Sequence, residues 1–166
     1  MKAVAIVLAL LLASGPAVAA DWTRHTNDRF GASAEIPASF RMEPPPENGD
    51  GFAFVSPDGR ARITVSGGYM VGSGGLAPFS EYKDDLLRYA ADDGVEITYR
   101  AGGRDWLAYS GLKGSTIVYG KSIAGCPDVV NSIHMEYPES ERSTYDPIAT
   151  RVSNSLRHRG GWGCSK

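Results

Sequence analysis

Four segments rich in β-branched and aromatic residues follow one another along residues 95–100, 105–111, 115–120 and 128–137. Short glycine-containing connections join the first segment to the second, at residues 102–103, and the second to the third, at residues 111–114. Connections this short allow only antiparallel pairing, because a parallel pair needs a crossover of a dozen or more residues. The pattern therefore predicts an antiparallel meander. Alternation places one set of side chains on one face of its last strand: Val129, Asn131, Ile133, Met135 and Tyr137.

Periodic apolar residues predict two helices beside this meander. Residues 78–93 carry one apolar stripe, and Gly94 is suited to end the helix. The stripe consists of Phe79, Tyr82, Leu86, Tyr89 and Ala90. Nearer the C-terminus, Asp146 is the predicted N-cap and Pro147 the first residue of a helix whose apolar face continues to Leu156. An antiparallel sheet of about six to seven strands with two main helices is an α+β fold.

Two further hairpins are predicted before the first helix, at residues 21–37 and 52–67. In the second, the sequence Ser-Pro-Asp-Gly predicts a three-residue loop with a glycine bulge that pairs Ser56 with Arg60. Phe54 then faces Arg62, so each face of the hairpin holds apolar residues and both sides of the sheet are expected to be covered in part. Residues 67–77 (GGYMVGSGGLA) are expected to form a flexible loop.

The first twenty residues have the organisation of a secretory signal. Lys2 provides a positive charge, residues 3–12 form an apolar run, and residues 17–19 (Ala-Val-Ala) offer small side chains to signal peptidase. Cleavage before Ala20 or before Asp21 fits equally well. The expected product is a single exported domain over residues 21–166, periplasmic or secreted, without stable membrane insertion.

The charge balance argues against two classes of partner. One of the 17 basic residues, Lys2, lies in the predicted signal, so 16 remain against 19 acidic residues, a net charge of −3. This balance provides no electrostatic footprint for nucleic acid and no polybasic membrane patch.

Two cysteines, Cys126 and Cys164, lie in glycine-containing segments. In an exported chain such a pair most often forms a disulfide, which here would fasten the C-terminal tail to the loop before the last strand. A metal or redox pair is the alternative. It is disfavoured because neither cysteine has a histidine or a carboxylate cluster beside it in sequence, and no CxxC motif is present. Sequence reasoning therefore predicts neither a metal site nor a cofactor.

The order of elements resembles that of the PsbP-like sandwich group and of small exported bacterial proteins of unknown function. The segments that carry this likeness are WTRHTNDRFG, PPPENGDGFAFVSPDGRA, DWLAYSG and NSIHMEYP with YDPI, which are spread along residues 22–148. The resemblance implies helices packed about an antiparallel sheet and a non-enzymatic accessory or binding role. It provides no catalytic residues, and the photosynthetic function of PsbP is not carried over.

Two motifs fail the tests for ligand sites that they suggest. A calcium loop that places Asp50 and Gly51 at its fifth and sixth positions puts Pro46 and Pro57 at ligand positions, so the polar residues there are better explained by turns. Residues 72–77 fit a loose GxGxxA pattern. The preceding strand alternates with polar residues, however, whereas a dinucleotide site needs a buried parallel strand.

The weak catalytic candidates are His134 and Glu136, which share one strand face, while the other histidines, His25 and His158, lie far away in sequence. His158, between two arginines, is interpreted as part of a basic end to the last helix. A histidine–carboxylate pair without a nucleophile is also an ordinary polar strand face. The sequence therefore favours a periplasmic binding or accessory protein with a protein partner. A small hydrolase using His134 and Glu136, and a small-ligand carrier with a pocket under residues 67–78, remain as alternatives.

Overall fold

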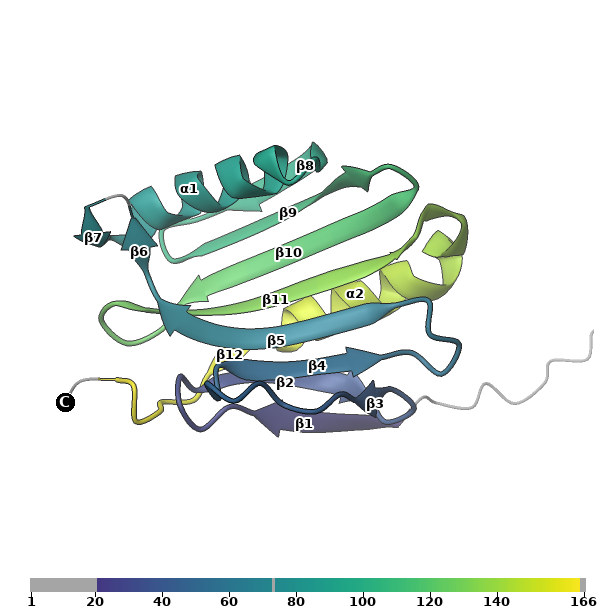
Figure 1. Ribbon diagram of the computed structural model, residues 1–166, viewed down its shortest axis with the longest axis horizontal. Coiled ribbons are helices and arrows are strands. Elements are labelled where there is room, and N and C mark those ends of the chain that lie inside the picture. Colours follow the sequence, from purple (N-terminus) through teal and green to yellow (C-terminus); the bar gives the residue numbers. More distant parts are fainter. Residues whose placement is uncertain (1–20, 73, 165–166) are drawn as a thin grey trace, which may run out of the picture.

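The computed structural model describes residues 21–72 and 74–164, so the predicted signal at residues 1–20 lies outside the described residues. Figure 1 shows a seven-stranded antiparallel sheet in the order β3-β4-β5-β11-β10-β9-β8. The strands are β3 (Arg41–Met42), β4 (Gly51–Val55), β5 (Arg62–Tyr69), β11 (Val129–Pro138), β10 (Thr116–Ala124), β9 (Trp106–Lys113) and β8 (Glu96–Gly102). The predicted α+β class and the antiparallel meander are confirmed.

Smaller elements complete the chain. A three-stranded sheet has the order β1-β2-β12 and contains β1 (Trp22–Thr26), β2 (Ala32–Pro37) and β12 (Arg157–His158). The strands β6 (Val71–Gly72) and β7 (Gly75–Leu76) pair with each other, and the helices are α1 (Phe79–Asp92), η1 (Glu139–Glu141) and α2 (Arg142–Ser155). No helix within residues 21–164, with residue 73 left out, is long and apolar enough to cross a membrane.

One face of the large sheet is covered by α2 and by the small sheet. Side chains of β4, β5, β10 and β11 meet those of β2 and α2 in one core, in which Ile63, Val65 and Met135 have no exposed surface. The predicted alternation of β11 is confirmed, because its residues at positions 129, 131, 133, 135 and 137 are all buried on this side. Strands that alternate in this way can bury one face and leave the other for a different use.

The opposite face is covered in part, by α1, which lies over β8 and β9 (Figure 1) and shares a core with Val118 of β10 and Val130 of β11. Phe79 and Ala90 of the helix join Leu107, Tyr109 and other side chains of the sheet in a second, smaller core. The predicted stripe is wrong at Tyr89, whose side chain is 61% exposed, and Leu87 packs against this core instead. Gly94 follows the helix with φ of +87°, which fits its predicted role as a stop.

The register predicted for the β4–β5 hairpin is wrong by one residue. Ser56 pairs with Ala61 rather than Arg60, and Phe54 faces Ile63 rather than Arg62. The reason lies in the loop, where the Ser56 hydroxyl accepts hydrogen bonds from the backbone N–H groups of both Arg60 and Ala61 and so holds four residues in the turn. The correction gives the hairpin one apolar face and one largely polar face, on which Ala53 and Val55 remain. The expected partial cover on both sides of the sheet is present, because α1 packs on part of the second side.

Three other predicted boundaries require correction. Residues 67–77 are not all loop, because β5 continues to Tyr69 and is followed by β6 and β7. Strand β9 continues to Lys113, which moves the connection to residues 114–115. The last helix starts at Arg142, so Pro147 lies inside it and Asp146 is not its N-cap. Pro147 is the sixth residue of the helix, so its missing N–H removes one hydrogen bond, the one to the Ser143 oxygen. The Asp146 carboxylate accepts a hydrogen bond from Tyr137.

Asp58 ties the β4–β5 turn to α2. Its carboxylate accepts hydrogen bonds from the Ser56 hydroxyl, the Arg60 backbone N–H and the Tyr145 hydroxyl, the last at 2.9 Å from each oxygen. The hydrogen bond from Ser56 is the largest cause of a lowered pKa at Asp58, followed by that from Arg60. Each of these donors favours the ionised carboxylate.

We predict that Asp58→Asn makes the stability of the protein less dependent on acidic pH. Because the pKa of Asp58 is lower in the folded chain, its ionised form stabilises the fold at pH values above its unfolded pKa of about 3.9, and this contribution is lost as pH falls through the folded pKa. The measurement is the free energy of unfolding in urea at about pH 6 and about pH 3. The difference between wild type and Asp58→Asn should shrink at the lower pH. An equal difference at both, or the same behaviour in the exposed control Asp105→Asn, would contradict the prediction.

The C-terminal tail returns to the turn between β1 and β2. Gly31 has φ of +70°, and a Cβ atom there would lie 1.4 Å from the backbone oxygen of Gly160. The Gly31 oxygen accepts a hydrogen bond of 2.8 Å from the Arg159 N–H, and the Arg29 oxygen accepts one of 2.7 Å from the Gly163 N–H. Only glycine allows the two backbones to approach this closely.

A comparison of two glycine substitutions tests this approach. Gly114 also has a positive φ, +61°, but nothing lies within 4 Å of its Cβ position. Gly114→Ala should cost roughly 1–2 kcal/mol of unfolding free energy from backbone strain alone. Gly31→Ala should cost more, because the tail must also move. Chemical denaturation checks both, and similar losses for the two variants would show that the tail does not dock tightly at Gly31.

Candidate functional site

The part of the large sheet that α1 leaves uncovered, formed by β4, β5 and part of β11, presents a largely polar surface. We call it the open face, and it consists of Ala53, Val55, Arg62, Thr64, Ser66, Ser132, His134 and Glu136. The register places these side chains directly opposite one another across β4, β5 and β11. All of them are at least partly exposed. This uncovered sheet face is a candidate binding surface.

A hollow of about 280 Å³ lies at the β4–β5 end of the open face. Its floor includes Ala53, Thr64 and Ser66, and one side is formed by the segment 43–50, which we call the proline wall. Several polar groups converge on it beside apolar proline and phenylalanine carbons. This combination of shape and few placed polar groups is typical of a ligand site.

The proline wall is held in place at both ends. The Glu43 N–H donates to the Ala53 oxygen at 2.8 Å, and the Asp50 oxygen accepts from the Gly67 N–H at 2.8 Å. In between, the buried Asn27 side chain donates from Nδ2 to the Gly49 oxygen at 2.7 Å. Prolines restrict the backbone further, so the wall is a fixed side of the hollow.

Charged groups around the hollow are already paired within the protein. Arg62 and Glu43 form an ion pair of 2.9 Å, and Arg29 and Asp50 form one of 2.7 Å. The second carboxylate oxygen of Asp50 accepts from the Asn48 side chain at 2.7 Å. These contacts show that Asn48 and Asp50, which suggested a calcium loop, stabilise the turn and the proline wall. A ligand here therefore does not need to carry a compensating charge.

The structure brings the two weak catalytic candidates together. His134 Nε2 lies 3.0 Å from Glu136 Oε1, and the two side chains are 42% and 43% exposed. A carboxylate in this position can orient an imidazole, but acid–base catalysis also needs a reacting group at the other ring nitrogen. The residue opposite His134 on β5 is Thr64, and on β10 it is Gly120. The pair is thus an ordered polar element of the open face.

Tyr109 marks the boundary between the open face and the part covered by α1. Its ring lies over Gly120, where a Cβ atom would come within 2.4 Å of the ring. Burial is the main cause that raises the pKa of Tyr109, and burial also raises that of Tyr82 on α1. Both phenols are therefore neutral at physiological pH. Sequence reasoning missed this boundary, since a lone glycine in a strand does not reveal which ring will cover it.

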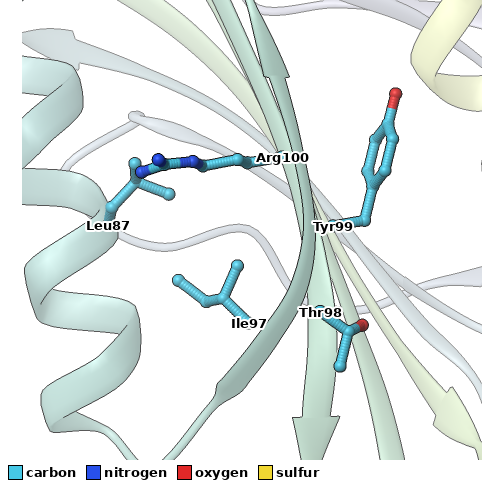
Figure 2. Close-up of a pocket in the computed structure, with 5 residues that line it drawn as sticks. All are labelled: Leu87, Ile97, Thr98, Tyr99 and Arg100. Carbon is cyan, nitrogen blue, oxygen red and sulfur yellow. The ribbon is translucent and has the colours of Figure 1, made fainter.

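A second hollow, of about 310 Å³, lies between α1 and the edge strand β8 (Figure 2). Leu87 of the helix and the side chains of Ile97 and Arg100 point into it, whereas Thr98 and Tyr99 both lie on the far side of the strand. The register shift between Ile97 and Tyr99 explains this break in alternation. With one charged group and little polar convergence, it is the weaker candidate.

The segment that suggested a nucleotide loop or a carrier pocket is packed against α1. Within this segment, the side chains of Met70 and Ala77 are 6% and 5% exposed, and Met70 packs in the same core as Phe79. The strand before the segment, β5, is antiparallel to both of its neighbours, whereas a dinucleotide fold requires a parallel one.

Cys126 and Cys164 form a disulfide, as predicted. The argument against a redox or metal role, however, relied on the absence of a histidine nearby, and that part is wrong. His158 Nε2 lies 3.6 Å from Cys164 Sγ. His158 is not part of a basic helix end but belongs to β12, which pairs with β2. Only this strand pairing brings the imidazole to the disulfide, so no local sequence signal could have revealed the contact.

No protein-family model matches the chain, and no curated protein matches its sequence. Among solved structures, it is similar to cyanobacterial PsbP (CyanoP) from Synechocystis sp. PCC 6803, with a TM-score of 0.57 and 14% identity over 87% of this chain and 96% of that one. LpqN of Mycobacterium tuberculosis, described as involved in cell envelope biogenesis, gives a TM-score of 0.49 and 15% identity over 82% of this chain and 89% of that one. The likeness to CyanoP confirms the predicted PsbP-like fold.

We predict that Asn27→Ala loosens the proline wall. The substitution removes the hydrogen bond to Gly49 and the one that Asn27 Oδ1 accepts from the Phe30 N–H, at a cost of about 1–3 kcal/mol. A Glu-specific protease should then cut after Glu47 faster than in wild type or in the exposed control Asn154→Ala. Equal acceleration at Glu96, in the distant strand β8, would indicate global unfolding and contradict local anchoring.

Proposed function

We propose that this chain is an exported, non-enzymatic accessory protein that binds a partner protein through the open face. The observation that carries the proposal is that part of one sheet face has no covering layer in the described chain and is bordered by the hollow and the proline wall. An antiparallel sheet commonly leaves one polar face to solvent, so it is the hollow with its fixed wall beside this face that supports a binding role. The partner would supply that missing layer.

The chemistry of the hollow indicates what the partner presents. The ion pairs of Arg62 with Glu43 and of Arg29 with Asp50 leave no charged group there that needs an opposite charge. The remaining contacts are small polar groups on the strands and proline carbons on the wall. An extended protein segment with uncharged or small apolar side chains meets both requirements, since the groups of the strands provide hydrogen bonds and the wall provides apolar contact.

Two features support export as part of this proposal. The Cys126–Cys164 disulfide is typical of oxidising compartments. The sequence of residues 1–20 has the organisation of a cleavable signal. A periplasmic or secreted binding protein is consistent with both. In this proposal His134 and Glu136 belong to the binding surface and carry no reaction.

Site-specific photocrosslinking tests the proposal. A photoreactive residue is placed at Thr64, in the floor of the hollow, and in a separate variant at Thr150, on the exposed side of α2. In cells that export the protein, Thr64 should yield one discrete protein adduct that wild-type protein displaces, and Thr150 should not. The adduct is identified by mass spectrometry.

A substitution that fills the hollow provides the matched control. Ala53→Arg should abolish the interaction with the identified partner, because the long side chain occupies the floor beside Thr64. Thr150→Arg should bind as wild type does, and thermal unfolding should verify that both variants are folded. Adducts that are the same at both positions, or a partner that binds Ala53→Arg normally, would contradict binding at the open face.

A further inference from the structure

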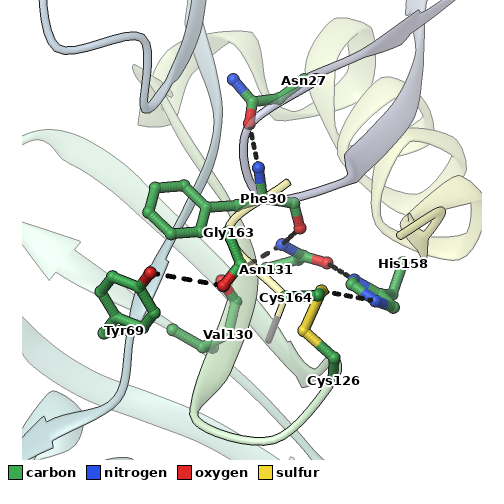
Figure 3. The surroundings of a disulfide bond; sticks show 9 residues. All are labelled: Asn27, Phe30, Tyr69, Cys126, Val130, Asn131, His158, Gly163 and Cys164. Atoms are coloured by element: carbon green, nitrogen blue, oxygen red, sulfur yellow. Dashed lines mark hydrogen bonds between the residues drawn. A yellow bond between two sulfur atoms is a disulfide. The ribbon is translucent and has the colours of Figure 1, made fainter. Parts of the chain in front are cut away.

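The disulfide lies beside two polar side chains from distant parts of the chain (Figure 3). His158 of β12 places Nε2 3.6 Å from Cys164 Sγ, and its Nδ1 lies 2.8 Å from Asn131 Oδ1 on β11. The donor atoms of Cys126, His158 and Cys164 all lie within 4.8 Å of one another. Two sulfur atoms and an imidazole nitrogen therefore lie close together. None of the three residues belongs to the open face.

The hydrogen bonds of Asn131 determine which way the imidazole faces. This side chain has no exposed surface, and its Nδ2 donates to the backbone oxygens of Phe30 at 2.8 Å and Val130 at 3.2 Å. The Oδ1 atom of Asn131 must therefore accept a hydrogen bond, and His158 donates that hydrogen bond from Nδ1. In the neutral imidazole, the lone pair of Nε2 then points at the sulfur. A disulfide has no S–H to offer this lone pair.

This arrangement matches what a bound metal requires of a histidine. Histidines that coordinate metals almost always donate the other ring N–H to a fixed acceptor, which sets the tautomer. With Zn–S of about 2.3 Å and Zn–N of about 2.0 Å, sulfur and nitrogen ligands of a tetrahedral ion lie roughly 3.5 Å apart. Cys164 Sγ and His158 Nε2 already have nearly this separation. Only the distance between the two sulfur atoms must change, from that of a disulfide bond to roughly 3.8 Å.

We propose that the reduced form of this protein binds one zinc ion through Cys126, Cys164 and His158, with Asn131 as the positioning residue. A dithiol reductant of the thioredoxin class opens the disulfide: two electrons and two protons pass to the cysteines, and the dithiol becomes a disulfide. The two thiols lose their protons on binding Zn²⁺, and water takes the fourth position. The disulfide and the zinc thiolate site are thus alternative states of the same residues.

The surroundings of the disulfide allow both its reduction and the binding of zinc. Cys126, His158 and Cys164 are each partly exposed, so a reductant and an ion can reach them. The imidazole also rests against the backbone of Gly125, where a Cβ atom would lie 2.7 Å from His158 Nδ1. Gly125→Ala therefore displaces the ring without removing a ligand.

The test measures zinc binding by the purified, untagged protein in competition with a chromophoric chelator. Reduced wild type should bind one Zn²⁺ per chain and release about two protons, whereas the oxidised protein should bind none at this site. Loss of the nitrogen ligand in His158→Ala should weaken binding by roughly 100-fold. Gly125→Ala should weaken it by roughly 10–100-fold through the orientation of the ring. His134→Ala, the matched control, should bind as wild type does.

A second measurement covers variants that fold poorly after reduction. Because an ion that binds only the folded chain raises its stability by mass action, Zn²⁺ should raise the thermal midpoint of reduced wild type and His134→Ala but not that of His158→Ala. Equal zinc affinity in reduced wild type and His158→Ala would overturn the proposal, since two cysteines alone would then account for binding. Zinc binding by the oxidised protein with the same affinity, or no shift of the midpoint in reduced wild type, would also overturn it.

Discussion

The strict alternation of β11 is the constraint on which the rest of the structure depends. Every second side chain from Val129 to Tyr137 is buried, with Ile133, Met135 and Tyr137 in the core formed with α2 and the small sheet, and the side chains in between face the other way. A one-residue slip would exchange these two sets. The open face is a consequence of this order, because the core under α1 extends from β8 and β9 to Val118 and Val130, whereas His134 and Glu136 stay partly exposed.

The parts of this fold that could be predicted from the sequence are those controlled by local periodicity. The meander follows from alternation and glycine turns, and α1 follows from its stripe and from Gly94. Where side chains compete with the backbone, prediction failed: the Ser56 hydroxyl holds the N–H groups of Arg60 and Ala61 and shifts the β4–β5 register. That single shift places Thr64 opposite Ala53 and Arg62 opposite Val55, which makes the second face of the hairpin largely polar.

The candidate sites were less predictable for a different reason. The hollow joins β4 and β5 to the proline wall, whose position depends on Asn27 in another sheet. The neighbourhood of the disulfide joins β11, β12 and the tail, and the sequence gives no sign that Asn131 and His158 face each other. The contact between His134 and Glu136 was foreseeable, because residues that are two positions apart on a strand lie on the same face. Contacts between elements depend on strand pairing, which no local pattern specifies.

The turn at residues 27–31 connects the two regions physically. On one side Asn27 and Arg29 hold the proline wall through Gly49 and Asp50. On the other, the Arg29 and Gly31 backbone oxygens accept hydrogen bonds from the tail that carries Cys164. The Arg29 guanidinium also lies over the Trp162 ring, 5.2 Å from its centre. A change at the disulfide can therefore reach the hollow through one short turn, but it alters binding there only if the tail holds this turn differently in the two redox states.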